Sequence, residues 1–172
     1  MTAVQVPQVS GDRIALRGFE IEDFDAYADF YGSDRARFVG GPMDRRKAWA
    51  EFAIDTVGWQ LRGYGMWAVD LQDSGELIGW AGVIQPEYYD EPELGWMLRD
   101  GYEGQGLAFE AAETARSFAR STLGLDGLAS FIAKGNDRSI RLAERLGAVW
   151  EADGKMGTTA FHRYRHPKQE NA

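Results

Sequence analysis

The chain has 172 residues, of which 44% are hydrophobic and 27% charged, and its formal net charge is −8. This composition is typical of one folded domain and excludes a disordered chain, while the negative charge disfavours nucleic acid and anionic membranes as partners. The sequence contains no cysteine, which excludes disulfides and thiolate metal ligands, and no stretch approaches the length of a membrane span. We therefore expect a cytoplasmic protein that contains no metal.

The first part of the chain predicts a strand followed by a helix. Residues 1–12 are expected to form an N-terminal extension without a signal sequence. Residues 13–17, Arg-Ile-Ala-Leu-Arg, alternate polar and apolar side chains and predict the first strand. Residues 22–31 begin with acidic side chains and place apolar ones at helical spacing, which predicts a helix with one buried stripe. The main domain is expected over residues 13–167, with a polar tail at 168–172.

A second helix is expected to begin after Asp44, whose side chain can cap the free amides of the first turn. It is expected to run to about Gly58, with one side formed by Trp49, Phe52, Ala53 and Thr56. Residues 66–71 and 77–84 are strand-like, and the sequence Gln-Asp-Ser-Gly-Glu between them is typical of a turn. These two segments predict a β-hairpin.

A glycine-rich stretch at residues 101–111, Gly-Tyr-Glu-Gly-Gln-Gly-Leu-Ala-Phe-Glu-Ala, follows a predicted strand over residues 93–99. Gly104 and Gly106 remove two side chains where the backbone must turn sharply. Consecutive amides can therefore face one anion at the start of the alanine-rich helix predicted over residues 107–123. We interpret the stretch as a phosphate-binding turn.

Two common phosphate-binding loops do not fit this stretch. A P-loop ends in Gly-Lys-Ser/Thr, whereas here Gly106 is followed by Leu107 and Ala108. A dinucleotide-binding turn requires a third small residue where this chain has Phe109. A nucleotide-binding module is therefore a poor explanation for the glycines.

A second informative segment follows a strand predicted over residues 128–133, which is apolar enough to be buried on both faces. It covers residues 136–148 and has residues typical of the start and the end of a helix. Asn136 or Asp137 can cap its start, and Gly147 can end it in a left-handed turn.

The C-terminal part of the chain predicts two more strands between residues 148 and 164, separated by residues 154–159. The segment at 165–172 is polar and is expected to fray. The two histidines, His162 and His166, are expected to be exposed and to take no part in metal binding or catalysis.

These segments together resemble the GNAT superfamily of acetyl-CoA-dependent N-acetyltransferases. The pyrophosphate loop of that family has the pattern Arg/Gln-x-x-Gly-x-Gly/Ala, and residues 103–108 are similar to it except that Glu103 stands at the first place. About thirty residues later, Asn-Asp-Arg-Ser-Ile-Arg-Leu-Ala-Glu-Arg-Leu-Gly-Ala at 136–148 resembles the family's second motif. The opening at residues 13–17 is similar to that of the ribosomal-protein N-alanine acetyltransferase branch, and the resemblance extends to about residue 167.

The resemblance implies a single α+β domain whose mixed, mostly antiparallel sheet splays between its fourth and fifth strands, with helices on its faces. Acetyl-CoA would lie in that gap. Backbone groups of Trp96, Met97 and Leu98 would pair with pantetheine, and Asn136 would face its arm. The pyrophosphate would be received by the amides of Gly104, Gln105, Gly106, Leu107, Ala108 and Phe109. Glu103 would point outward, because its charge beside an anion site is unfavourable.

The resemblance also implies acetyl transfer to a primary amine, either a small molecule or a protein N-terminus, and a possible homodimer. Glu93 matches the family's acidic position and is the candidate general base, with an exposed strand-start carboxylate as the alternative. Ser139 is the candidate acid, because Ala143 stands where many members carry a tyrosine, although Ser139 also fits a purely structural place in a helix first turn. Independently of the resemblance, Tyr88 and Tyr89 in the acidic loop at residues 87–93 are candidate acceptor contacts, since carboxylates attract an ammonium and tyrosine faces can hold a cation; a solvated acidic hairpin is the alternative.

The departures at Glu103 and Ala143 leave a second interpretation open. A protein that binds acyl-CoA without turnover, such as a sensor, would also need the glycine turn and the helix after Asn136. Release of free CoA in the presence of an amine discriminates between the two.

Overall fold

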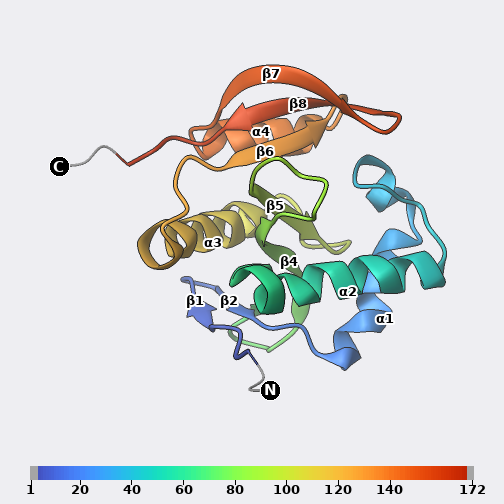
Figure 1. Cartoon of the computed structure of the whole chain (residues 1–172). Helices are drawn as coiled ribbons and strands as arrows, with labels where there is room; N and C mark the ends of the chain where they lie inside the picture. Colours follow the sequence, from blue (N-terminus) through green and yellow to red (C-terminus); the bar gives the residue numbers. More distant parts are fainter. Residues whose placement is uncertain (1–3, 170–172) are drawn as a thin grey trace.

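The computed structural model describes residues 4–169 as one eight-stranded sheet with helices on both faces (Figure 1). The strands are β1 (Val9–Ser10), β2 (Ile14–Arg17), β3 (Met66–Leu71), β4 (Leu77–Ile84), β5 (Glu93–Leu98), β6 (Ala129–Ala133), β7 (Val149–Met156) and β8 (Thr159–Arg165). The helices are α1 (Phe24–Tyr31), α2 (Arg45–Arg62), α3 (Leu107–Leu123) and α4 (Asp137–Arg145), with short 3-10 turns η1 (Ile21–Asp23) and η2 (Asp34–Phe38). Within the described residues, no helix has both the length and the apolar character needed to cross a bilayer.

The sheet has the order β1-β2-β3-β4-β5-β6-β8-β7, and every neighbouring pair except β5 and β6 is antiparallel. β5 and β6 are parallel and pair only at Glu93 and Ala129, after which they diverge. Figure 1 shows β6, β8 and β7 as a layer set apart from β4 and β5. The predicted α+β fold with a splayed, mostly antiparallel sheet is confirmed. The splay was predicted between the fourth and fifth strands and lies between β5 and β6. The strand numbers differ by one because an additional short strand, β1, forms within the expected N-terminal extension.

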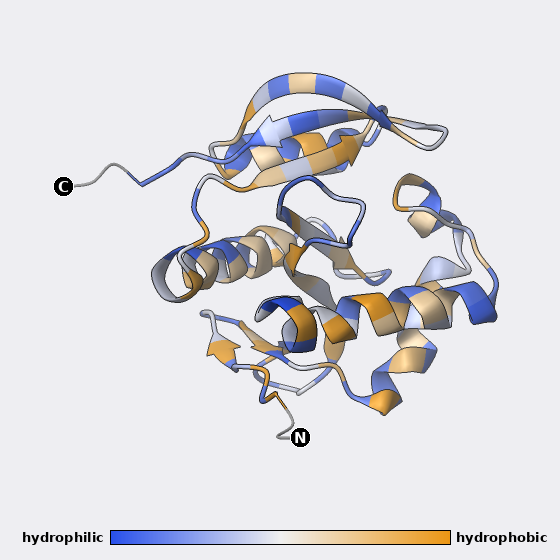
Figure 2. Ribbon diagram, viewed as in Figure 1, coloured by the Kyte–Doolittle hydropathy of each residue, from blue (hydrophilic) through white to orange (hydrophobic). Residues whose placement is uncertain are grey.

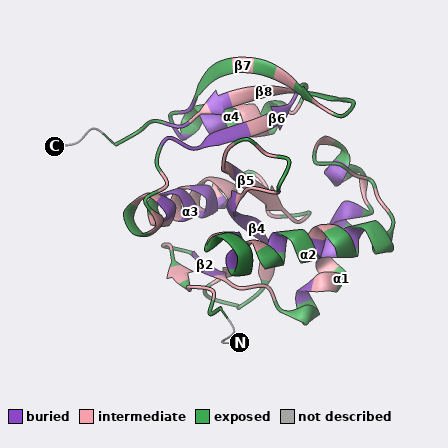
Figure 3. Ribbon diagram, in the orientation of Figure 1, coloured by how far each residue is buried: buried purple, intermediate pink, exposed green. Residues whose placement is uncertain are grey.

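The two faces of the sheet are covered by different kinds of helix. α3 packs on β4 and β5 through a row of small buried side chains: Ala111, Ala112, Ala115 and Ala119. On the other face, α1 and α2 bury an aromatic cluster in which the Trp80 ring lies 4.7 Å from that of Tyr27. Figure 3 shows the buried residues gathered in the central strands and on the inner sides of the helices, and Figure 2 shows that β5 and β6 are mainly apolar. This packing fixes β5 from both faces.

α2 begins as predicted but ends later. Asp44 caps it, with the carboxylate accepting a hydrogen bond from the amide of Lys47 at 2.8 Å. The helix continues through Gly58 to Arg62. The chain after the helix returns so close to Gly58 that a Cβ there would lie 3.0 Å from the carbonyl oxygen of Tyr64. Gly58 therefore permits close packing and does not end the helix.

The buried side of α2 also differs from the predicted one. Trp49, Ala53 and Thr56 are exposed. The buried positions are Ala48, Phe52, Asp55 and Trp59. Because the carboxylate Asp55 lies within this buried stripe, a search for hydrophobic residues at helical spacing does not identify it.

The C-terminal segment contains two further corrections. β7 runs through Gly154, where a Cβ would lie 2.4 Å from the ring of Phe161, and the turn comes later, at Gly157. His166 is 1% exposed, and its amide donates to the carbonyl oxygen of Leu128 at 2.9 Å. The prediction of an exposed tail histidine is therefore wrong for His166, since the chain continues beside β6 after β8 ends.

Candidate active site

A cavity of about 320 Å³ lies where β5 and β6 diverge. Its walls come from β5, β6, the start of α4, α2, the segment after α1 and the loop before β5. The predicted site residues that line it are Glu93, Trp96, Met97, Asn136, Ser139, Tyr88 and Tyr89. A second hollow of about 580 Å³ contains none of them, and its Arg165 is bound to Glu91 and Glu151. The first cavity is therefore the candidate site.

Along the edge of β5 that faces this cavity, side chains bind two of the backbone carbonyl groups. Ser130 donates from its hydroxyl to the carbonyl oxygen of Leu94 at 2.7 Å, and Arg35 donates to that of Leu98 at 2.8 Å. Because backbone groups alternate in direction along a strand, the N–H and C=O of Trp96 face the same side. Met97 lies opposite Trp80, so its backbone faces β4 and its side chain lines the cavity.

The glycine turn presents amides at the start of α3. Gly104 and Gly106 have φ angles of 74° and 78°, a region that side chains disfavour. Gly106 caps α3 without a side chain, and the first helical bond runs from the amide of Glu110 to the carbonyl of Gly106 at 3.1 Å. The amides of residues 107–109 therefore have no acceptor within the helix.

Two guanidinium groups flank this turn. Arg13 Nη2 and Arg145 Nη1 lie 3.5 and 3.9 Å from the place that a Cβ at Gly106 would take. Arg13 Nε donates to Glu110 Oε2 at 2.8 Å, and the Arg145 guanidinium stacks 4.1 Å from the ring centre of Phe109. The chain is acidic as a whole, but this turn is locally cationic and suits a phosphate.

Glu103 is turned toward a cation and does not extend into solvent as expected. Its side chain is 30% exposed and forms an ion pair with Arg35 of η2. It also accepts the amide of Gly101 at 3.0 Å, and Arg138 lies 3.9 Å away. Partial burial opposes ionisation, but these bonds hold the pKa of Glu103 below its usual value. The charge at this irregular motif position is thus neutralised by Arg35.

Glu93 stands at the closed end of the gap, where β5 and β6 last pair. It is half-buried, and its Oε1 accepts the amide of Phe131 at 3.0 Å. Burial raises the pKa of Glu93 to about 8, and the hydrogen bonds from Phe131 and Tyr89 oppose that shift only in part. A carboxyl group whose pKa lies near neutral pH can accept a proton from a substrate in the cavity.

α2 adds two carboxylates that the sequence analysis missed. Glu51 and Asp55 are one helical turn apart, and both line the cavity. Asp55 is 6% exposed, and its Oδ2 accepts a hydrogen bond from the hydroxyl of Tyr27 at 2.7 Å. Burial raises the pKa of Asp55 to about 7, while the Tyr27 bond lowers it and the charge of Glu51 raises it. The sequence contained one signal for this site. Asp55 follows Phe52 by three residues and precedes Trp59 by four, which places an acidic side chain on the buried side of the helix.

The start of α4 combines cavity lining with helix capping. Asn136 Oδ1 accepts the amide of Ser139 at 3.4 Å, so the side chain of Asn136 is the helix cap. Ser139 lies in the first turn of α4 and also lines the cavity. Ala143 is fully buried and offers no proton donor.

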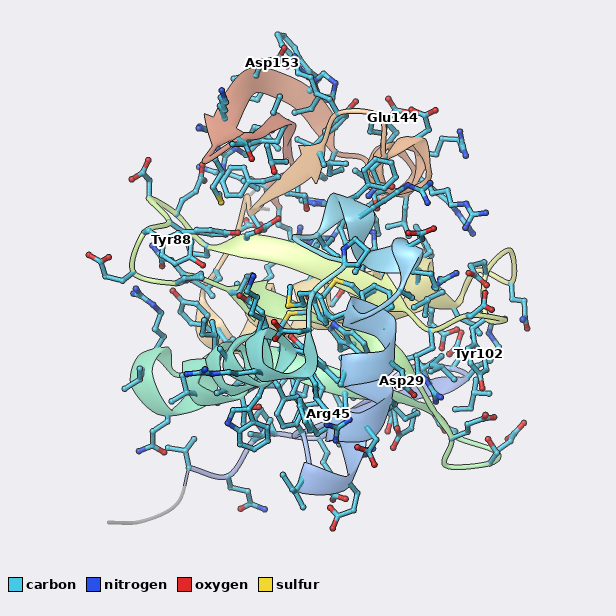
Figure 4. All side chains as sticks on the ribbon, turned by 90° about the vertical axis from the view of Figure 1, so that its right-hand side faces the viewer. Asp29, Arg45, Tyr88, Tyr102, Glu144 and Asp153 are labelled. Atoms are coloured by element: carbon cyan, nitrogen blue, oxygen red, sulfur yellow. The ribbon has the colours of Figure 1, made fainter. Side chains whose placement is uncertain are left out.

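The two tyrosines before β5 both line the cavity but differ in exposure. Tyr88 is 63% exposed, and Figure 4 shows it on the loop at the level between α2 and β7. The ring of Tyr89 packs edge-on against Phe131 at 5.7 Å. The predicted acceptor contacts Tyr88 and Tyr89 therefore both belong to the cavity wall.

A buried chain of hydrogen bonds supports the closed end of the gap. His166 Nδ1 lies 3.1 Å from Arg116 Nη1, and its Nε2 lies 2.9 Å from Ser130 Oγ. Because Arg116 can only donate, Nε2 donates to Ser130, whose hydroxyl donates to Leu94. Burial and the nearby arginines lower the pKa of His166 to about 4, so the ring is neutral at physiological pH. His162, also expected to be exposed, is half-buried in β8.

Asp55→Asn should raise thermal stability, and the gain should grow with pH. The pKa of Asp55 in the folded protein, about 7, exceeds that of an unfolded aspartate. The folded state therefore binds more protons, and this group makes stability fall as pH rises from about 4 to about 7. Asparagine does not titrate and still accepts from Tyr27. We expect a melting temperature higher by about 2 to 4 °C at pH 8 and by less at pH 5. Melting curves that differ equally at both pH values would contradict this explanation.

Comparisons with known proteins show the family and the fold. Residues 13–149 match the family model described as an acetyltransferase (GNAT) domain. The crystal structure of an acetyltransferase from Agrobacterium tumefaciens strain C58 is similar, with 35% identity, a TM-score of 0.90 and coverage of 98% of each chain. The uncharacterized protein YkkB of Bacillus subtilis is 29% identical over 148 residues, covering 79% of this chain and 81% of that protein. RimL, a ribosomal L7/L12 α-N-protein acetyltransferase solved in complex with coenzyme A, shares the fold at 15% identity, with a TM-score of 0.75 over 93% of this chain and 97% of that one.

Proposed function

This chain belongs to the GNAT acetyltransferases, and on that premise we propose that it moves an acetyl group from acetyl-CoA to the nitrogen of a primary amine. The observation that carries the proposal is the place of Glu93, a carboxyl group with a pKa of about 8 at the closed end of a cavity between diverging strands. The acceptor would be a small-molecule amine or a protein N-terminus. The reaction as proposed requires no metal.

The residues of the gap fit acetyl-CoA. The open backbone groups of Trp96 would pair with the pantetheine arm, while the side chains of Met97 and Asn136 would line it. The amides of residues 104–109 would receive the pyrophosphate, with Arg13 and Arg145 adding positive charge. Each charge-assisted hydrogen bond contributes about 1.5 to 3 kcal/mol, so several amides can anchor the group without a lysine.

Catalysis asks the protein mainly to move a proton. When bound, acetyl-CoA supplies the acetyl group as a thioester, whose C–S bond breaks as the C–N bond to the acceptor forms. The acceptor ammonium must lose a proton, which at neutral pH costs about 1 kcal/mol for an α-amine and about 4 to 5 kcal/mol for a lysine-like amine. Glu93 would accept that proton, directly or through a water. Ser139 would donate one to the departing thiolate.

A panel of amines and N-terminal peptides tests this proposal, with free CoA as the measured product. We expect release of CoA with at least one amine and loss of that release in Glu93→Gln. The alternative is a protein that binds acyl-CoA without turnover, which the buried Ala143 favours because no side chain there can protonate a thiolate. Tight binding of acetyl-CoA with no CoA release across the panel would support that alternative.

Arg35→Met should weaken acetyl-CoA binding by about tenfold, which corresponds to about 1.4 kcal/mol. The change removes the nearer of the two guanidinium groups that offset the charge of Glu103 beside the proposed pyrophosphate site, and it removes the donor to Leu98. Calorimetric titration with acetyl-CoA measures the effect. The double variant Arg35→Met/Glu103→Gln is the matched control and should recover most of the affinity. An equal loss in both variants would argue against the electrostatic explanation.

A further inference from the structure

The part of the cavity formed by α2 and β5 gathers three carboxyl groups. Glu51 and Asp55 lie on successive turns of α2, Glu93 lies at the start of β5, and all three line the same cavity. Like charges four residues apart destabilise a helix, so the Glu51–Asp55 pair acts against α2. Within residues 4–169, none of the three carboxylates forms a salt bridge. The cavity therefore lacks the cations that would balance it.

Asp55 is the least favourable of the three when ionised. Only 6% of the residue is exposed, and its one hydrogen bond in the described part of the chain comes from Tyr27 to Oδ2. Asp55 lines the cavity, and within residues 4–169 its other carboxylate oxygen, Oδ1, accepts no hydrogen bond. A buried carboxylate is normally paired with a cation or protonated, because its desolvation is costly. A cation brought by a ligand would complete this arrangement.

The carboxylates do not converge on one point. Across the described residues, no group of three or more His, Cys, Asp or Glu side chains could hold a metal ion. The rest of the cavity wall on this side is aromatic or apolar, with Tyr31, Tyr88 and Met66 among its members. Such walls fit methylene groups, and tyrosine faces attract ammonium. The cavity thus presents carboxyl groups from two elements, α2 and β5, together with aromatic and apolar surface.

We propose, resting on the acetyl transfer proposed above, that the acceptor is a small dication: a primary amine joined by an alkyl chain to a second cationic group. The reacting amine lies at Glu93, and the second cation is bound by Glu51 and Asp55. A protein N-terminus without a basic side chain nearby brings one ammonium and leaves the α2 pair without a cation. Glu51 and Asp55 are therefore specificity-determining residues, and the acceptor is a small molecule.

Linear amines in matched pairs test this inference. A series from 1,3-diaminopropane to 1,8-diaminooctane is compared with the monoamines of equal length, so that each pair differs only in the second ammonium. We expect kcat/KM, measured by CoA release, to be at least about tenfold higher for one diamine than for its monoamine, the effect of one charge-assisted bond. Glu51→Gln keeps the side-chain size and should reduce this ratio by about tenfold.

The controls separate the acceptor class from the reaction itself. Asp29→Asn removes an exposed carboxylate of α1 (Figure 4) that does not line the cavity, and it should leave the ratio unchanged. Acetyl-CoA binding reports whether Glu51→Gln is folded. If Glu51→Gln does not bind acetyl-CoA, Asp55→Asn is used as the second variant. Equal kcat/KM for diamines and monoamines, or a preference for N-terminal peptides, would overturn the proposal of a dicationic acceptor. The proposed acetyl transfer would still stand. Absence of CoA release with every amine would instead overturn the proposed function.

Discussion

Gly106→Val should weaken acetyl-CoA binding by at least about 100-fold while the protein stays folded. Gly106 has a φ of 78°, and a branched side chain there would project toward Arg13 and Arg145, into the place proposed for the pyrophosphate. The loss of two or more charge-assisted amide bonds is sufficient for an effect of this size. Calorimetric titration with acetyl-CoA measures the affinity.

The matched control for this variant is Gly124→Val, at the other end of α3. Gly124 has a φ of 69°, so valine imposes a similar backbone strain, yet its Cβ meets no neighbour within 4 Å. Both variants should lower the melting temperature, but only Gly106→Val should lose acetyl-CoA. Unchanged affinity in folded Gly106→Val would refute the assignment of the glycine turn.

Glu93→Gln should lower kcat by about 100-fold to 10,000-fold, the usual contribution of a general base. Because burial raises the pKa of Glu93 to about 8, the carboxyl group is mostly protonated below that pH and becomes a base above it. The kcat of the unchanged protein should therefore rise with pH up to about 8, and this rise should be absent in the variant. Glutamine retains an oxygen that can accept the amide of Phe131, so the local structure is kept. Kinetics across the pH range on one good acceptor measure both effects.

A weakly basic acceptor distinguishes a base from a residue that only holds structure. Trifluoroethylamine is largely neutral at pH 7 and needs little help to lose a proton. If Glu93 removes that proton, Glu93→Gln should slow this amine much less than an ordinary alkylamine. An equal loss with both acceptors would assign Glu93 a structural role.

Local signals in the sequence were sufficient for the elements that hold the proposed acetyl-CoA site. Asp44 and Asn136 cap α2 and α4, and α3 covers the predicted residues 107–123. Caps and left-handed glycines act on amides within a few residues, so neighbouring sequence determines them. The place where the sheet splays followed from family resemblance and not from local pattern.

Residues whose role depends on distant partners could not be predicted. Asp55 is held by Tyr27, 28 residues earlier in the chain, and His166 gains its partners only when the last segment lies beside β6. Gly58 and Gly154 resemble turn signals, but each permits a close approach by another part of the chain. These are properties of tertiary packing. The homodimer and the cytoplasmic location stay predictions.

The bond between Glu93 and Phe131 gives the proposed base a mechanical role. In a continued parallel ladder the amide of Phe131 would find a backbone carbonyl, but here a side-chain carboxylate takes that place. A carboxylate accepts a hydrogen bond more strongly than a neutral acid does. Each proton that Glu93 takes would therefore loosen one of the hydrogen bonds that join the two halves of the sheet. Glu93 would thus both accept the proton of the acceptor amine and help to hold β5 and β6 together. The contact between these strands would be weakest just after transfer, when the products must leave the gap.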